Sequence, residues 1–172
     1  MRLILFRHGH ADEADPARWP DDRERPLSAR GAERTADAAR GLADLEESVT
    51  RVITSPLCRA RETARILVDV LAVDAPFETH DALAPGGSAR RLLETLPADH
   101  VDDTLVLVGH EPDLGKLAGT LLFGAPKPIP LKKAGACAIV FDGPAAPGAG
   151  RLAWFLPPRA LRRLGKHLKE HA

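Results

Sequence analysis

Short apolar runs alternate along the chain with longer segments in which apolar residues recur at helical spacing. Continuous apolar runs at residues 3–6 and 104–108 are typical of strands buried on both faces of a parallel sheet, and residues 51–55 form another short predicted strand, which Pro56 ends. The helical segments follow them, at residues 29–45, 57–73 and 113–123. Strands that alternate with helices predict a three-layer α/β/α sandwich with a mainly parallel central sheet.

The remaining pattern is weaker but fits the same architecture. It predicts strands at residues 137–141 and 152–156, helices at 88–96 and 159–171, an extended edge at 77–83 and a loop at 12–25. Ser28 is placed to cap the helix that begins at Ala29, with Leu27 as a hydrophobic staple.

Length and composition place limits on the class of protein. The 172 residues suit one domain, which we expect to span residues 1–172, and Lys and Arg balance Asp and Glu to a formal net charge of zero. Cys58 and Cys137 lie far apart and form no metal-ligand spacing, which suits a reducing cytoplasm. The apolar run at residues 3–6 is too short for a signal peptide or a membrane span, so we expect a cytoplasmic protein.

Basic side chains and histidines follow three of the predicted strands. Arg7, His8 and Gly9 end the first strand, Ser55 and Arg59 follow the second, and His110 follows the third. Because the carboxyl ends of parallel strands open on one edge of a sheet, we expect these residues to surround a single anion site. The alternatives are a solvated loop at residues 7–9, a core or capping role for His110 and a surface position for Arg59.

The residue types in this set suit a phosphoryl group. Guanidinium groups bind its equatorial oxygens in bidentate fashion, so Arg7 and Arg59 would clamp it. His8 would be the nucleophile, kept neutral by the two arginines and fixed in one tautomer by a backbone carbonyl. His110 would donate to a phosphoryl oxygen. Gly9 would let the backbone approach the anion closely.

Three sequence blocks in this order resemble the histidine phosphatase superfamily, the phosphoglycerate mutase-like proteins. The blocks are Arg7-His8-Gly9, the segment Ser55-Pro56-x-x-Arg59-Ala60-x-x-Thr63-Ala64, and Gly109-His110. Short length, the segment Arg25-Pro26-Leu27-Ser28 and the lack of a long insertion resemble the SixA branch, the phosphohistidine phosphatases. The resemblance implies a phosphoglycerate mutase-like fold, His8 as nucleophile, and a phosphate pocket of Arg7, Arg59 and His110. It also implies that Arg25 lies near the phosphate. We expect no metal and no cofactor.

The chain departs from the superfamily's pattern in one respect. Large members use an acidic residue between the second and third blocks to protonate the leaving group, and here Asp74, Glu78 and Asp81 fit that pattern poorly. Imidazole leaves a phosphoramidate more easily than an alkoxide leaves an ester, so weak provision of an acid favours a P–N substrate. The missing insertion predicts an open pocket suited to a side chain on a protein surface.

Other features have competing interpretations. His8 and His10 could form a metal pair, but no further ligand cluster accompanies them, and His10 is expected at the mouth of the site or in solvent. Glu111 is expected to be a surface acid. A further set of basic residues is interpreted first as a solvated face and second as a binding patch: Lys127, Lys132, Lys133, Arg162, Arg163, Lys166 and Lys169.

These observations favour a phosphatase that acts on phosphohistidine in partner proteins and releases inorganic phosphate. A phosphomonoesterase for a small metabolite and a non-catalytic phosphate-sensing module are the alternatives, and a mutase would need an enclosed site with a good acid. We expect no nucleic-acid partner and no membrane partner.

Overall fold

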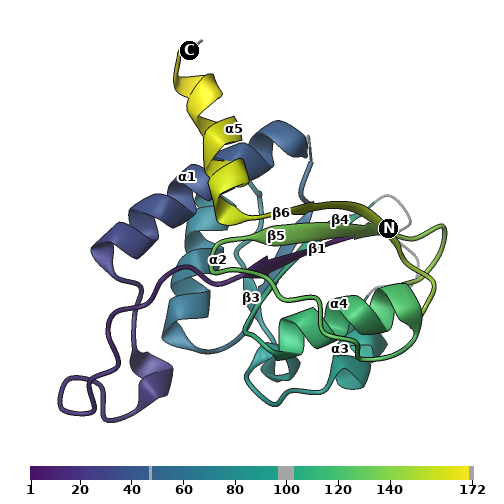
Figure 1. The fold of residues 1–172 in the computed structure, drawn as a ribbon, viewed down its shortest axis with the longest axis horizontal. Coiled ribbons are helices and arrows are strands. Elements are labelled where there is room, and N and C mark those ends of the chain that lie inside the picture. The colour runs from purple at the N-terminus through teal and green to yellow at the C-terminus, as the bar shows by residue number, and fades with distance from the viewer. Residues whose placement is uncertain (47, 97–102, 171–172) are drawn as a thin grey trace.

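The computed structural model describes residues 1–46, 48–96 and 103–170, with only the backbone at residues 167–170. A six-stranded sheet lies at its centre in the order β3-β2-β4-β1-β5-β6 (Figure 1). The strands are β1 (Arg2–Arg7), β2 (Arg51–Thr54), β3 (Glu78–Thr79), β4 (Thr104–Gly109), β5 (Ala136–Val140) and β6 (Arg151–Leu156). Neighbouring strands from β3 to β1 pair in parallel, whereas β5 is antiparallel to both β1 and β6. The sheet is therefore mainly parallel, as predicted.

Helices cover both faces of the sheet (Figure 1). They are α1 (Ala29–Leu45), α2 (Cys58–Val70), α3 (Ala89–Thr95), α4 (Asp113–Phe123) and α5 (Pro158–Glu170), with short 3-10 helices η1 (Asp22–Glu24) and η2 (Asp81–Leu83). Successive residues of β1 point to opposite faces, so Leu3 and Leu5 pack with α3 and α4 while Ile4 and Phe6 pack with α1, α2 and α5. This arrangement confirms the predicted three-layer α/β/α sandwich.

The structure differs from the sequence-based expectations mainly at the ends of elements. Helix α2 stops at Val70 rather than residue 73, and Ala72 then takes a left-handed backbone conformation with φ of 51°. The predicted edge at residues 77–83 was partly wrong: only Glu78–Thr79 is a strand, because the His80 side chain accepts from the Ala82 N–H and starts η2. Residue 171, the predicted end of the last helix, lies outside the described residues.

The loop between β1 and α1 has more structure than predicted. It contains η1, and an antiparallel bridge joins Ala11 to Leu27 at its base. Ser28 caps α1 as predicted, since its side chain accepts from the Gly31 N–H. Within the described part of the chain, the helices are too short or too polar to span a lipid bilayer.

Candidate active site

Three neighbouring strands bring the predicted site residues together. Strands β1 and β4 pair in parallel with Arg7 opposite Gly109, so His8 and His110 leave the sheet side by side. Their ring centroids lie 4.8 Å apart with the planes inclined at 53°. On the other side of β4, the Ser55 N–H donates to the Val108 carbonyl at 2.9 Å, which aligns the end of β2 with the same edge. The sequence-based expectation of one shared edge therefore describes the geometry.

His8 is buried, with 6% of its surface exposed. Its Nδ1 lies 2.7 Å from the Gly9 carbonyl, and since a carbonyl only accepts, Nδ1 carries the proton. The lone pair is then on Nε2, the atom a nucleophile would use. The pKa of His8 is lowered to about 3, chiefly by burial and next by His110, with smaller contributions from the charges of Arg59 and Arg7. Burial thus keeps the ring neutral more than the arginines do.

His110 is held by Ser55. Its Nε2 lies 2.8 Å from Ser55 Oγ, and the same hydroxyl accepts from the Leu57 N–H at 3.3 Å. Burial and the charges of Arg59 and Arg7 lower the pKa of His110 to about 4, so this ring is neutral too. When Ser55 donates its one proton to Nε2, the proton of the neutral ring is on Nδ1, where it can be donated to an anion.

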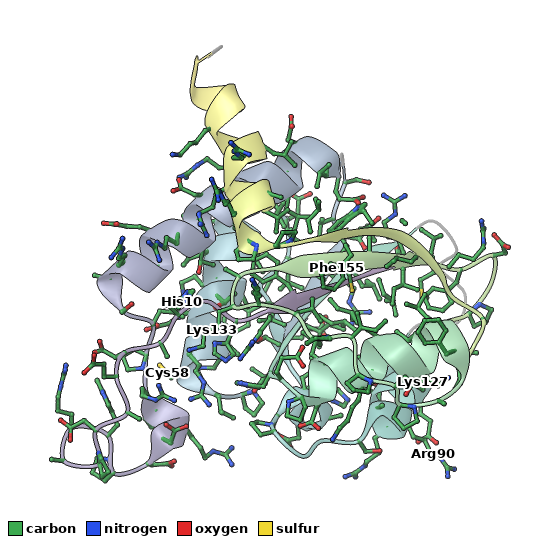
Figure 2. The ribbon with its side chains drawn as sticks, viewed as in Figure 1. His10, Cys58, Arg90, Lys127, Lys133 and Phe155 are labelled. Atoms are coloured by element: carbon green, nitrogen blue, oxygen red, sulfur yellow. The ribbon has the colours of Figure 1, made fainter. Side chains whose placement is uncertain are left out.

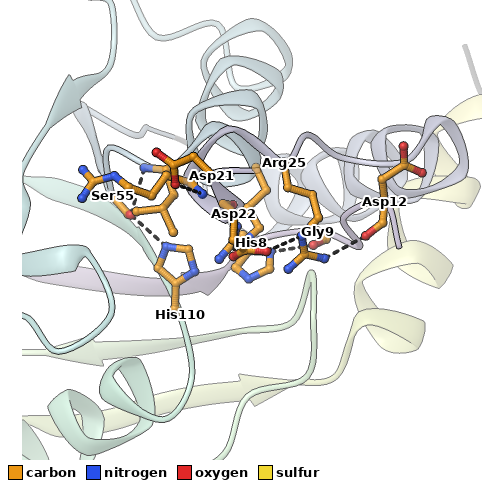
Figure 3. A network of polar contacts seen from close by, with 11 residues as sticks. His8, Gly9, Asp12, Asp21, Asp22, Arg25, Ser55 and His110 are labelled. Carbon is orange, nitrogen blue, oxygen red and sulfur yellow. Dashed lines mark hydrogen bonds and ion pairs between the residues drawn. The ribbon is translucent and has the colours of Figure 1, made fainter. Parts of the chain in front are cut away.

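The arginines form a network around one aspartate. Arg59, 6% exposed, donates through Nη1 to the Asp22 backbone carbonyl at 2.8 Å and pairs with its carboxylate at 3.2 Å. Arg25 donates from Nε to the other carboxylate oxygen of Asp22 at 2.7 Å, and from Nη1 to the Asp12 carbonyl at 2.8 Å (Figure 3). Hydrogen bonding from Arg25 is the largest cause that lowers the pKa of Asp22. Arg25 is therefore joined to Arg59 through Asp22, which lies in the segment predicted to be a loop.

Arg7 is oriented by a chain of contacts that includes Glu111. Its Nη1 donates to the Leu131 carbonyl at 2.8 Å, and the Leu131 N–H donates to Glu111 Oε1 at 3.0 Å. Glu111 is half-buried, and burial raises its pKa. The expectation that Glu111 is a surface acid was wrong. Its carboxylate is half-buried and holds the Leu131 backbone, whose carbonyl in turn accepts from Arg7.

Gly9 and Ser55 support the site through contacts within the protein. The Gly9 N–H donates to Thr63 Oγ1 at 3.1 Å, and Thr63 Oγ1 donates to the Arg59 carbonyl at 2.7 Å. A Cβ atom at Gly9 would lie 2.1 Å from Thr35 Oγ1, so only glycine fits between β1 and α1. Ser55 is fully buried. These contacts position His8, His110 and Arg59, and the predicted role of Gly9 and Ser55 in binding substrate stays a prediction.

The acids and the second histidine considered from the sequence are exposed, and within the described residues none of them is hydrogen-bonded to His8 or His110. Glu78 forms an exposed pair with Arg51 at 2.8 Å, and Asp74 and Asp81 are exposed. His10 is exposed. Across the described ranges, no group of three or more His, Cys, Asp and Glu side chains could hold a metal ion.

Comparison with known proteins identifies the family of the chain. The family model described as Histidine phosphatase superfamily (branch 1) matches residues 3–84. An uncharacterized protein from Picosynechococcus is 42% identical over 138 residues, covering 78% of this chain and 82% of its own. Phosphohistidine phosphatase SixA from Escherichia coli is 30% identical over 132 residues, covering 75% and 79%. The chain belongs to the histidine phosphatase superfamily.

Solved structures show the same fold. The protein histidine phosphatase SixA, complexed with tungstate, superimposes with a TM-score of 0.82 at 24% identity, over 94% of this chain and 99% of its own. A phosphoserine phosphatase mutant from Entamoeba histolytica, complexed with phosphoserine, gives a TM-score of 0.64 at 16% identity, over 93% and 98%. The phosphoglycerate mutase-like fold is thus shared by phosphatases that differ in substrate.

Proposed function

We propose that this chain is a phosphohistidine phosphatase that acts on partner proteins and passes the phosphoryl group through His8. The observation that carries the proposal is the state of His8: a buried, neutral ring with its proton held on Nδ1 by the Gly9 carbonyl. Such a ring offers a lone pair on Nε2 near neutral pH, beside the charges of Arg7 and Arg59.

The reaction would proceed in two displacements. In the first, His8 Nε2 attacks phosphorus while the bond from phosphorus to the substrate's imidazole nitrogen breaks, and that nitrogen takes a proton from water. In the second, water attacks the phosphoryl group on His8, which releases inorganic phosphate and restores the free ring. Arg7, Arg59 and the Nδ1–H of His110 would stabilise the charge on the equatorial oxygens in both steps, and Arg25 would add positive charge.

The leaving group is inferred from the absence of a suitable acid. No carboxyl group of the described residues is hydrogen-bonded to His8 or His110. The two carboxylates whose charges raise the pKa of His110 have other partners: Asp113 accepts from the Gly86 N–H, and Asp22 is held by Arg25 and Arg59. Glu111, the carboxyl next to His110 in sequence, accepts from the backbone of Leu131. Imidazole requires less help from an acid than an alkoxide does, so this arrangement supports a P–N substrate over a phosphate ester.

Trapping the intermediate tests the nucleophile. A peptide carrying radiolabelled phosphohistidine is mixed with the enzyme and quenched in base, which preserves phosphohistidine, and the labelled protein is mapped by mass spectrometry. We expect label on His8, none in His8→Asn, and undiminished label in the control His10→Asn, because His10 is exposed and two residues away. Label on another residue, or equal turnover by His8→Asn, would refute the assignment.

Substrate comparison tests the leaving group. We expect kcat/KM for the phosphohistidine peptide to exceed that for phosphoserine peptide and for a sugar phosphate by roughly a hundredfold or more, the scale of one missing general acid. The reverse order would favour a phosphomonoesterase. A wild-type chain that binds phosphate but turns over none of these donors would favour a phosphate-sensing module.

A further inference from the structure

One face of the molecule beside the candidate active site carries a cluster of basic side chains. We call it the basic face. It consists of residues from the first half of α1, from the segment before β5 and from α5: Arg30, Arg34, Lys132, Lys133, Arg159, Arg162, Arg163 and Lys166. Figure 2 shows α1 and α5 side by side, with nitrogen-tipped side chains on both and with His10 and Lys133 below them.

The charges of the basic face are not neutralised within the protein. None of its members has an ion-pair partner in the part of the chain that the structure describes. Arginines elsewhere do: Arg40 pairs with Asp37, Arg51 with Glu78, and Arg90 with Glu94. Because the whole chain has a net charge of zero, this face is a local excess of cations that form no ion pairs, rather than part of a basic protein.

The packing of α5 against α1 fixes which side of α5 carries its charges toward solvent. Its apolar side is already used, since Leu161 is fully buried and the backbones of α1 and α5 touch at two glycines. A Cβ atom at Gly41 would lie 1.9 Å from the Leu161 carbonyl oxygen, and one at Gly165 would lie 2.5 Å from that of Asp37. On the outer side, a hollow of about 310 Å³ is lined by Arg159, Arg162, Arg163 and Lys166, with no acidic residue.

The basic face extends to the candidate active site. Lys133 precedes Ala134, whose N–H is shared between the carbonyls of Arg7 and His8 at 3.0 and 3.2 Å. After burial, the charges of Lys133, Arg34 and Arg162 are the largest causes that lower the pKa of His10. The electrostatic fields of the basic side chains on α1, on α5 and at Lys133 therefore overlap at His10, two residues from His8.

We propose that the basic face is a docking surface for an acidic face of the protein that carries the phosphoryl group. The proposal rests on the proposed function, because the docked protein would present its phosphohistidine to the adjacent pocket. An acidic protein surface complements the unpaired cations and is steered toward them before contact. An anionic membrane is disfavoured, since basic helices bind membranes by inserting an apolar side, and that side of α5 is buried against α1.

Charge neutralisation at matched positions tests the proposal. The test variant carries Arg159→Gln, Arg162→Gln and Arg163→Gln, all on α5, and glutamine retains helix propensity. The control variant carries Arg61→Gln, Arg65→Gln and Arg91→Gln, which remove the same charge from exposed arginines on α2 and α3. The probes are two phosphohistidine peptides of equal length, one flanked by Asp and Glu and one flanked by Ser and Gly.

For the acidic peptide, we expect the test variant to lose roughly fivefold to tenfold in kcat/KM, mainly through KM, and to lose most of the salt dependence. The neutral peptide and an aryl phosphate should change by less than about twofold, and the control variant should resemble the wild type. Equal losses in both variants, or an equal loss on the neutral peptide, would overturn the proposal.

Binding of the unphosphorylated acidic peptide, followed by fluorescence anisotropy, separates docking from chemistry. Binding to wild type that weakens in the test variant supports the basic face even if phosphohistidine proves not to be the substrate. Absence of binding, or a variant that loses affinity only for phosphatidylserine-containing vesicles, would overturn the docking surface while leaving the proposed function intact.

Discussion

The two buried histidines form different hydrogen bonds, and this difference separates their proposed roles. His8 donates from Nδ1 to a carbonyl, which leaves a lone pair on Nε2, whereas His110 is bonded through Nε2 to a hydroxyl. A carbonyl can only accept, but a hydroxyl can donate, so one ring is set as a nucleophile and the other can act as a donor. The Gly9 carbonyl and the Ser55 hydroxyl therefore set the ring tautomers on which the two proposed roles depend.

The Asp22 carboxylate lies between Arg59 and Arg25 and forms an ion pair with each of them. If the proposed site binds phosphate, the Asp22 carboxylate would compete with it for the same guanidinium groups, while the Asp22 backbone carbonyl keeps a bond to Arg59 that does not depend on the side chain. We expect Asp22→Asn to bind product phosphate roughly twofold to fivefold more tightly, the range typical of an exposed ion pair. Inhibition of aryl phosphate hydrolysis by inorganic phosphate measures this.

The neighbouring aspartate provides the control for this experiment. Asp21→Asn removes the same charge from the same loop, but the Asp21 side chain caps η1 by accepting from the Arg23 N–H, a task asparagine also performs. Its inhibition constant should equal that of the wild type. Weaker phosphate binding by Asp22→Asn would show that the carboxylate positions Arg59 rather than competing for it.

At the scale of elements, the sequence predicted the strands and helices that carry the site but not the loops that complete it. Continuous apolar runs such as residues 104–108 have a strong signal because both faces of the strand are buried. No comparable sequence signal marks Asp22 or Glu111, because their roles depend on Arg59 and Leu131, which are distant in sequence. Thr63 lay within a recognised block, yet its bond to the Gly9 N–H joins residues 54 positions apart.

The contact between α1 and α5 gives a prediction at this scale. Gly41 lies within α1, where alanine would ordinarily be favoured by about 1 kcal/mol, but its Cβ atom would meet the Leu161 backbone. We expect Gly41→Ala to lower the free energy of unfolding by about 1–3 kcal/mol, the usual cost of overpacking, as measured by urea denaturation. Gly143→Ala is the control, because nothing lies within 4 Å of its added Cβ atom. Equal stability in the two variants would contradict the close helix contact.

For the whole molecule, the burial of two neutral histidines makes stability depend on pH. The pKa values of His8 and His110 in the folded protein are about 3 and about 4, while both rings titrate near 6.5 when unfolded. As the pH falls below about 6.5, the unfolded chain binds protons that the folded protein does not, so the free energy of unfolding decreases. This stability is fully present above about pH 6.5 and is lost progressively until the folded pKa values are reached, at about pH 4 for His110 and about pH 3 for His8.

Between about pH 7 and about pH 5.5, the two rings together should account for a loss of about 2–3 kcal/mol in the free energy of unfolding. Urea denaturation at these two pH values measures the loss, in a range where most carboxyl groups stay ionised in both states. The double variant His8→Asn and His110→Asn should lose much less over the same interval, whatever its absolute stability. An equal loss in the variant would show that the acid sensitivity of the fold arises outside the site, and that the two histidines are not held neutral by burial.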